Sequence, residues 1–158
     1  MNGMQSEPPD LSTSRQRQRW MTILAKTSGE DLEALWERFD TKPAYRFLRP
    51  PETGLAMVRG RAGGTGQPFN LGEASITRCA VHVSGGAAGF AVVLGRDERK
   101  AELAAVFDAL LLDPSRNAAL ERDVVKPLED AIEARRRACA TKAAATKVDF
   151  FTLVRGED

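Results

Sequence analysis

The hydrophobic period of this chain changes twice, and those changes limit the possible folds more than any other feature. Near the N-terminus apolar residues recur at helical spacing, as in Trp20, Ile23 and Leu24. From Ala44 to Leu94 the chain reads instead as short strands between turns, and helical spacing returns afterwards. N-terminal helices, a sheet and C-terminal helices are thus segregated along the chain, which predicts an α+β fold.

The middle segment predicts a mostly antiparallel sheet of about four strands. Pro50 and Pro51 separate the first two strands, and a short loop with Gly85 and Gly86 joins the last two as a hairpin. The four predicted strands lie at residues 45–48, 54–62, 73–83 and 90–94.

Capping residues predict where the helices begin and end. Ser28 with Asp31 fits a capping box, and Asp97 suits the N-cap of the helix after the sheet. Pro114 ends that helix, because the residue before a proline is pushed out of the α region. Pro127 suits the first turn of a long final helix.

Length and charge narrow the class of protein. The 158 residues favour one domain, residues 12–158, after a tail of residues 1–11 whose composition is typical of disorder. The net charge is +1, so the overall charge of the chain does not attract nucleic acid or a membrane surface. No apolar run approaches the roughly 20 residues of a spanning helix. We therefore expect neither nucleic acid nor membrane as a partner.

The two cysteines indicate the redox state of the cellular compartment in which the chain works. Cys79 and Cys139 lie far apart and belong to no Cys-x-x-Cys pair, and the first residues lack the apolar core of a signal peptide. This predicts a reducing, cytoplasmic location with both thiols in the core, because free cysteine is among the most buried residue types. On the final helix we expect Cys139 to face inward with Leu128, and residues 135–137 to face water.

The stretch RAGGTGQPFN, residues 61–70, raises the question of nucleotide binding. A Walker A loop requires Gly-Lys-Ser/Thr, but Gly66 is followed by Gln-Pro; a dinucleotide fingerprint opens a helix, but here a strand follows. We interpret the stretch as a hairpin loop in which glycine supplies positive φ. The alternative is that Gly64, Thr65 and Gly66 contact a phosphate through backbone N–H groups.

The residue pattern predicts no catalytic residue and no metal site. His82, the sole histidine, lies in a predicted strand without a second ligand at metal-binding spacing, and no nucleophile is paired with a base. The basic stretch RQRQRW, residues 15–20, suggests contact with nucleic acid. On a helix, however, its Arg and Gln residues form a solvated face while Trp20 joins the apolar stripe.

A series of short pieces carries a resemblance to a known family. The pieces, in order, are ETGL (52–55), GGTG (63–66), ITR (76–78), GRD (95–97) with AE after it (101–102), and VDFFTLVRG (148–156). This series resembles the PhnG family, a subunit of the bacterial carbon–phosphorus lyase core complex. The resemblance covers residues 13–157, and its most specific parts are VDFFTLVRG and GGTG with TR.

The resemblance implies a role in organic phosphonate catabolism. Family members assemble with the H, I and J subunits. Together with H, I and L they are implicated in displacing adenine from MgATP by an alkylphosphonate, which gives α-D-ribose 1-alkylphosphonate 5-triphosphate. The resemblance implies no catalytic residue on this chain and no cofactor bound by it alone; MgATP is a substrate of the assembled complex, whose nucleosidase-type chemistry is attributed chiefly to the I subunit.

Two alternatives to an accessory subunit stay open on the sequence. One is a free-standing phosphate-handling enzyme that uses the glycine loop with Arg78 and Arg96. The other is a small nucleic-acid-binding module that contacts nucleic acid with its N-terminal helix.

The closing VDFFTLVRG predicts a contact with a partner. In an extended segment Phe150 and Phe151 project to opposite faces, so one ring needs an apolar surface beyond the domain's own core. With Arg155 nearby, this favours docking on another subunit. The alternative is that the segment completes the chain's own sheet, with both rings under the final helix.

Overall fold

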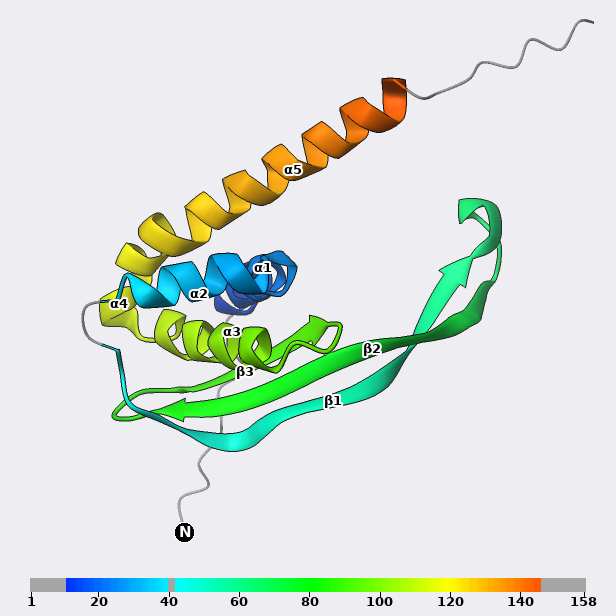
Figure 1. Cartoon of the computed structure of the whole chain (residues 1–158). Helices are drawn as coiled ribbons and strands as arrows, with labels where there is room; N and C mark the ends of the chain where they lie inside the picture. The colour runs from blue at the N-terminus through cyan, green and yellow to red at the C-terminus, as the bar shows by residue number, and fades with distance from the viewer. Residues whose placement is uncertain (1–10, 40–41, 146–158) are drawn as a thin grey trace, which may run out of the picture.

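The computed structural model describes residues 11–39 and 42–145, and along the chain the sheet follows N-terminal helices and precedes C-terminal helices (Figure 1). This confirms the predicted α+β class. The elements, in chain order, are α1 (Leu11–Lys26), α2 (Gly29–Glu37), β1 (Tyr45–Arg61), the 3₁₀ turn η1 (Ala62–Gly64), β2 (Pro68–Val83), β3 (Ala88–Leu94), α3 (Glu98–Leu111), α4 (Pro114–Leu120), the π-helical turn η2 (Glu121–Val125) and α5 (Lys126–Ala145).

Within residues 11–39 and 42–145 the sheet has three antiparallel strands in the order β1-β2-β3, slightly fewer than the predicted count of about four. The runs on either side of Pro50 and Pro51 form one strand, β1, whose register shifts between Arg49 and Glu52. β1 is an edge strand, and prolines are tolerated at edges and bulges because no ladder bond needs their missing N–H. The prolines therefore mark an irregularity within one strand and not its end.

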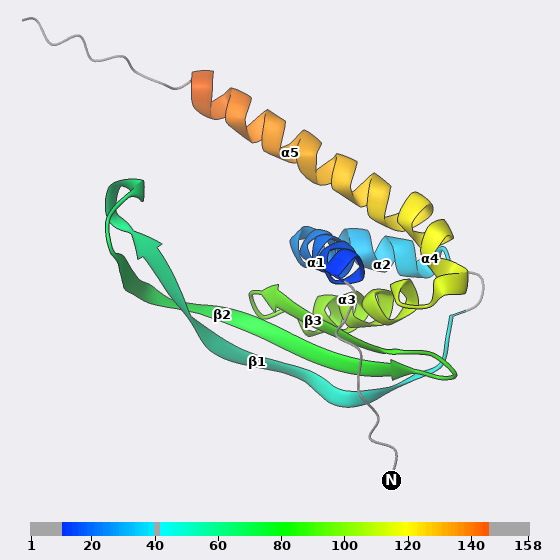
Figure 2. The same cartoon turned by 180° about the vertical axis from the view of Figure 1, so that it is seen from behind.

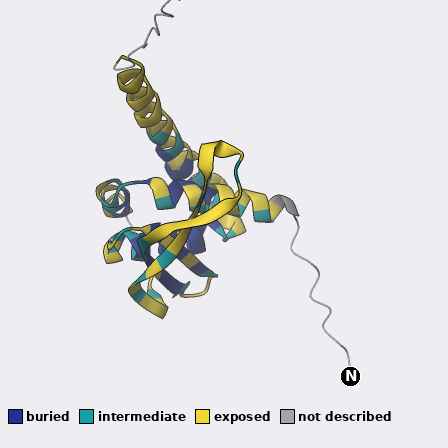
Figure 3. Cartoon of the chain, turned by 90° about the vertical axis from the view of Figure 1, so that its right-hand side faces the viewer, coloured by how far each residue is buried: buried dark blue, intermediate teal, exposed yellow. Residues whose placement is uncertain are grey.

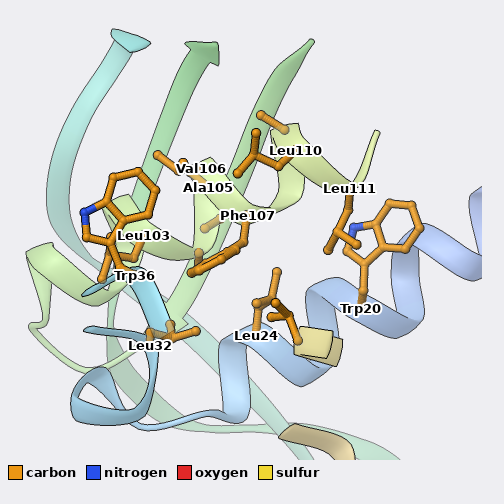
Figure 4. Close-up of a cluster of buried hydrophobic side chains, with 14 of the residues drawn as sticks. Trp20, Leu24, Leu32, Trp36, Leu103, Ala105, Val106, Phe107, Leu110 and Leu111 are labelled. Atoms are coloured by element: carbon orange, nitrogen blue, oxygen red, sulfur yellow. The ribbon is translucent and has the colours of Figure 1, made fainter. Parts of the chain in front are cut away.

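Helices cover one face of the sheet. α3 packs against β2 and β3, and α1 and α2 pack against α3 (Figures 1 and 2). Figure 4 shows Trp20, Leu24, Trp36 and Phe107 in the core that results, where Trp36 meets Phe107 edge-on at a centroid distance of 6.3 Å. The strand residues buried under the helices alternate along each strand and are Thr77, Cys79, Val81 and Val83 on β2 and Gly89, Ala91 and Val93 on β3.

β3 approaches α3 closely at Gly89. A Cβ atom at this position would overlap the carbonyl oxygen of Ala105 and the backbone nitrogen of Ala109. Glycine is required here because a side chain would push the strand away from the helix.

The helix boundaries follow the predicted caps. Ser28 accepts a hydrogen bond from the N–H of Asp31 at 3.1 Å, and Asp97 accepts one from the N–H three residues later at 2.9 Å. α3 ends before Pro114, and Pro127 lies in the first turn of α5, as predicted. These boundaries were predictable because each depends on a few neighbouring residues.

A buried carboxylate ties α1 and β3 to α3. Asp108 Oδ2 accepts from Arg17 Nη2 at 2.7 Å and from the N–H of Phe90 at 2.9 Å, while Oδ1 accepts from the indole of Trp20 at 2.8 Å. The Asp108 side chain is fully buried, so the charge and hydrogen bonds of Arg17 offset the cost of removing it from water.

The last helix leaves the body of the protein. Leu128 is buried and Arg135 pairs with Asp31 of α2 at 2.8 Å, but the last turns of α5 project away from the sheet and the other helices (Figure 1). Cys79 is buried as predicted, whereas Cys139 is exposed, so the prediction of a core position for Cys139 is wrong. Residues 135–137 are exposed, as predicted. Of the described helices, none combines the length and the apolar character needed to cross a membrane.

Candidate functional site

Three of the sequence pieces that carry the resemblance meet on the sheet. Glu52 of ETGL faces Arg78 of ITR, whose Nη2 donates to the Glu52 carboxylate at 3.1 Å. At the next register position the hydroxyls of Thr53 and Thr77 lie 3.1 Å apart, and Thr77 Oγ1 donates to the carbonyl of Gly95, from GRD, at 2.7 Å. We term Glu52, Thr53, Thr77, Arg78 and Gly95 the motif cluster.

The motif cluster spans both faces of the sheet. Because side chains alternate along a strand, Thr77 lies buried on the helix-covered face while Glu52 and Arg78 are exposed on the other face. The hydrogen bond from Arg78, with its positive charge, holds the pKa of the Glu52 carboxyl below its ordinary value. A phosphate at Arg78 would therefore compete with Glu52 for the guanidinium.

Arg96 lies beside the motif cluster, in the turn from β3 to α3. Gly95 has a φ of 93°, in the left-handed region that favours glycine, and Asp97 caps α3, so the GRD piece builds this turn. Arg96 itself is exposed. The two predicted arginines thus lie next to the two ends of one hydrogen bond. Arg78 follows Thr77, which donates the bond, and Arg96 follows Gly95, whose carbonyl accepts it.

The glycine loop forms the tip of the β1–β2 hairpin, which confirms its interpretation as a hairpin loop. Gly63 and Gly64 have φ of 60° and 79°, and the N–H of Gly66 donates to the carbonyl of Ala62 at 3.0 Å. Thr65 is exposed at the same tip. One of the N–H groups considered for phosphate binding is therefore used inside the loop.

The loop and the two predicted arginines do not form one site. Along β1 the chain runs nine residues from Glu52, opposite Arg78, to Arg61, opposite Pro68. At roughly 3.3 Å per residue these positions are about 30 Å apart. A single phosphate group cannot contact both.

A second polar cluster, which sequence reasoning missed, joins β1, α2 and α3. The hydroxyl of Tyr45 donates to Glu102 Oε1 at 2.5 Å, and Arg99 lies 2.8 Å from Glu33 and 3.1 Å from Glu102. Burial, followed by the hydrogen bond to Glu102, raises the pKa of Tyr45 to about 12. Glu102 belongs to the AE piece; only its i, i+3 spacing to Arg99 was visible in the sequence.

Two arginines of α1 are engaged in ion pairs within the fold. Arg17 pairs with Asp108, and Arg19 contacts Glu121 at 2.8 Å and Glu129 at 2.7 Å. The sequence predicted that these side chains face water. At Arg17 and Arg19 they instead form ion pairs that join α1 to other helices. Their guanidinium groups are committed to carboxylates, which argues against nucleic-acid binding through this helix.

Metal ligands do not gather among the described residues, and the buried thiol is not activated. Residues 11–39 and 42–145 contain no group of three or more His, Cys, Asp or Glu side chains placed to hold a metal ion. Burial raises the pKa of the Cys79 thiol to about 11, so the thiol stays protonated at neutral pH and is a poor nucleophile.

Large apolar side chains are exposed on all three strands, beginning with Phe47 and Leu48 near the start of β1. Phe90, Val92 and Leu94 alternate along β3 onto the face away from the helices. Figure 3 shows the uncovered part of the β1–β2 hairpin as an exposed ribbon. The exposed apolar residues of that uncovered part are Leu55, Met57, Val58, Phe69 and Leu71.

The predicted contacts of the closing segment stay untested. Phe150, Phe151 and Arg155 lie outside the described residues. Neither docking on a partner nor completion of the chain's own sheet is decided by the structure.

The fold and its surfaces define a class of protein. It is a small α+β chain whose antiparallel sheet is covered by helices on one face. Its polar clusters are paired internally, and the described helices leave apolar strand residues exposed. Exposed apolar surface of this kind is typical of proteins that bind other proteins.

Comparison with known proteins identifies the family. The family model described as "Phosphonate metabolism protein PhnG" matches residues 15–156. The Alpha-D-ribose 1-methylphosphonate 5-triphosphate synthase subunit PhnG of Rhizobium meliloti (strain 1021) is 45% identical over 143 residues, covering 90% of this chain and 91% of the relative. The chain belongs to the PhnG family, as the sequence pieces indicated.

Proposed function

We propose that this chain is a subunit of an α-D-ribose 1-methylphosphonate 5-triphosphate synthase, within the carbon–phosphorus lyase core complex of organic phosphonate catabolism. The observation that carries the proposal is the 45% identity to a subunit of that synthase along 90% of the chain. The motif cluster supports it, because the family-like residues join β1, β2 and the start of α3 into one framework.

In this proposal the assembled complex transfers the ribose triphosphate of MgATP to an alkylphosphonate. The bond from ribose C1′ to adenine breaks, and a phosphonate oxygen forms the new bond to C1′. The chain acts in this step with the H, I and L subunits, and H, I and J are its partners in the core complex. MgATP is a substrate of the complex, and the complex works in the cytoplasm.

The contribution of this chain is assembly and positioning. The ion pairs of Arg17, Arg19, Arg78 and Arg99 lie within the chain and stabilise its own fold, whereas the exposed apolar residues of the β1–β2 hairpin suit contact with other subunits. Arg78 and Arg96 stay candidate phosphate contacts in the assembled state, and so, at a separate place, do Gly64, Thr65 and Gly66. Phe150, Phe151 and Arg155 stay candidate partner contacts.

Growth and co-purification test this proposal. A strain that lacks this chain should fail to grow on methylphosphonate as the sole phosphorus source but should grow on phosphate, and the restored full chain should rescue it. A tagged full chain should also co-purify with the other subunits. Normal growth of the deletion strain on methylphosphonate would refute the proposal.

A further inference from the structure

The β1–β2 hairpin continues well beyond the rest of the sheet. β3 pairs with β2 only from Ile76 to His82, so residues 55–75 form a two-stranded ribbon with its loop, which we term the hairpin arm. Residues 55–61 of β1 alone reach about 23 Å at roughly 3.3 Å per residue. Figures 1 and 2 show the hairpin arm leaving the helix-covered body.

The hairpin arm is apolar for a ribbon surrounded by water. Leu55 is 63% exposed and Leu71 is 66% exposed, and Met57, Val58 and Phe69 are exposed too. A two-stranded hairpin is marginally stable at best in water, and apolar patches on a surface mark sites where other molecules bind. The hairpin arm therefore has the composition of a segment that is covered in use.

The apolar side chains lie on both faces of the hairpin arm. Leu55 and Met57 share one face by alternation, and Val58 lies on the other. Phe69 pairs with Gly60, two residues after Val58, and so joins the Val58 face. A flat partner surface would cover one face only, whereas a groove covers both.

The charges of the hairpin arm change from base to tip. Glu73, opposite Met57, is its acidic residue, and residues 58–72 contain Arg59 and Arg61 but no Asp or Glu. Arg61 donates to the carbonyl of Gly66 at 3.1 Å, and this acceptor is neutral, so no carboxylate of the described residues balances its positive charge. The tip is therefore complementary to carboxylates.

We propose that the hairpin arm inserts into a groove of another subunit of the synthase, with apolar walls along the ribbon and carboxylates near its tip. The proposal rests on the proposed function. A second copy of this chain fits less well, because two hairpin arms would bring four arginines together with only two glutamates. The two arginines near the tip would act as anchors, since arginine is enriched at such interfaces.

Co-expression of the tagged full chain with the other synthase subunits tests the apolar contact. The double variant Leu55→Ser/Met57→Ser should keep its thermal unfolding profile, because neither side chain is buried in the body. It should lose co-purification by at least about tenfold, the effect of roughly 1.4 kcal/mol of binding free energy. The matched control Val92→Ser/Leu94→Ser removes exposed apolar area from β3 and should co-purify normally.

Charge reversal tests the chemistry of the groove. Arg59→Glu/Arg61→Glu should also lower co-purification by at least about tenfold. Arg59→Lys/Arg61→Lys keeps the charge and should retain most of it. Unchanged co-purification after charge reversal would contradict the carboxylates at the tip.

Three results would overturn the proposal. Normal co-purification of the apolar variant would show that the hairpin arm is not the contact, while the proposed function would stand. An equal loss in the β3 control would show that exposed apolar area in general governs assembly. A purified chain that is a dimer by light scattering, and that the hairpin-arm variants make monomeric, would assign the arm to a second copy. By contrast, a wild-type chain that co-purifies with no subunit would refute the proposed function itself.

Discussion

β1 and β2 pass through two different environments, and the contrast separates what stabilises this chain from what it presents to other molecules. Under the helices, Val81 is fully buried and Thr77 bonds to its neighbours on both sides. In the hairpin arm the same strands carry Leu55, Met57 and Leu71 in water. Apolar residues thus stabilise the fold in the body, whereas those of the arm are free to contribute to binding.

The largest expected difference is between two phenylalanines. Phe107→Ala in the core should lower the free energy of unfolding by about 3–5 kcal/mol, because a buried ring is replaced by a cavity. Phe69→Ala in the hairpin arm, where the ring is 46% exposed, should change it by about 0.5 kcal/mol or less. Urea denaturation measures both, and equal losses would show that the arm contributes to folding.

The buried carboxylate should come next in size. Asp108→Ala leaves the Arg17 guanidinium, the Trp20 indole and the Phe90 N–H without their acceptor, so the free energy of unfolding should fall by about 2–4 kcal/mol. Asp130→Ala, which removes an exposed pair with Lys126, is the control and should cost about 0.5 kcal/mol or less. A loss at Asp108 no larger than the control would contradict its role in joining α1 and β3 to α3.

Two glycines sharpen the comparison further. Gly89→Ala forces a methyl group into α3 and should destabilise the fold by about 1–3 kcal/mol. Gly72→Ala in the hairpin arm meets no atom within 4 Å and should stay within about 0.5 kcal/mol of the wild type. Thermal unfolding distinguishes them, and a neutral Gly89→Ala would mean that β3 and α3 separate easily.

The smallest expected effect is a change in the free energy of unfolding with pH, caused by the phenol of Tyr45. The pKa of Tyr45 rises from 10.0 to about 12 in the fold, so the folded state holds the phenol proton more tightly. Its contribution to stability is complete below pH 10 and is lost as the pH rises from 10 to 12. The difference in stability between wild type and Tyr45→Phe should shrink across that window. A difference that stays constant would mean that neither burial nor Glu102 raises the pKa of Tyr45 in the folded state.

The sequence predicted correctly those elements that depend on interactions between neighbouring residues. The helix caps at Ser28 and Asp97 and the β2–β3 hairpin are confirmed, since each depends on a few adjacent residues. Pro50 and Pro51 misled the strand count, because their effect depends on whether the strand lies at the edge of the sheet.

Contacts between residues far apart in the chain could not be predicted from the sequence. Arg17 and Asp108 lie 91 positions apart, and nothing in either neighbourhood marks the pair. The hairpin arm was missed for a different reason, because an alternating strand reads alike whether or not a helix covers it. Cys139 was misplaced because helical spacing does not tell where α5 leaves the core.

The proposal that this chain acts as a subunit, and releases no adenine by itself, is tested most directly by measuring adenine release. MgATP and methylphosphonate are incubated with the assembled synthase, with the same subunits lacking this chain, and with this chain alone, and free adenine is quantified by chromatography. The account predicts adenine from the complete set and only background from the other two. Steady release by the purified chain alone, abolished by Arg78→Ala or Thr65→Ala, would contradict it, as would full activity of the set that lacks this chain.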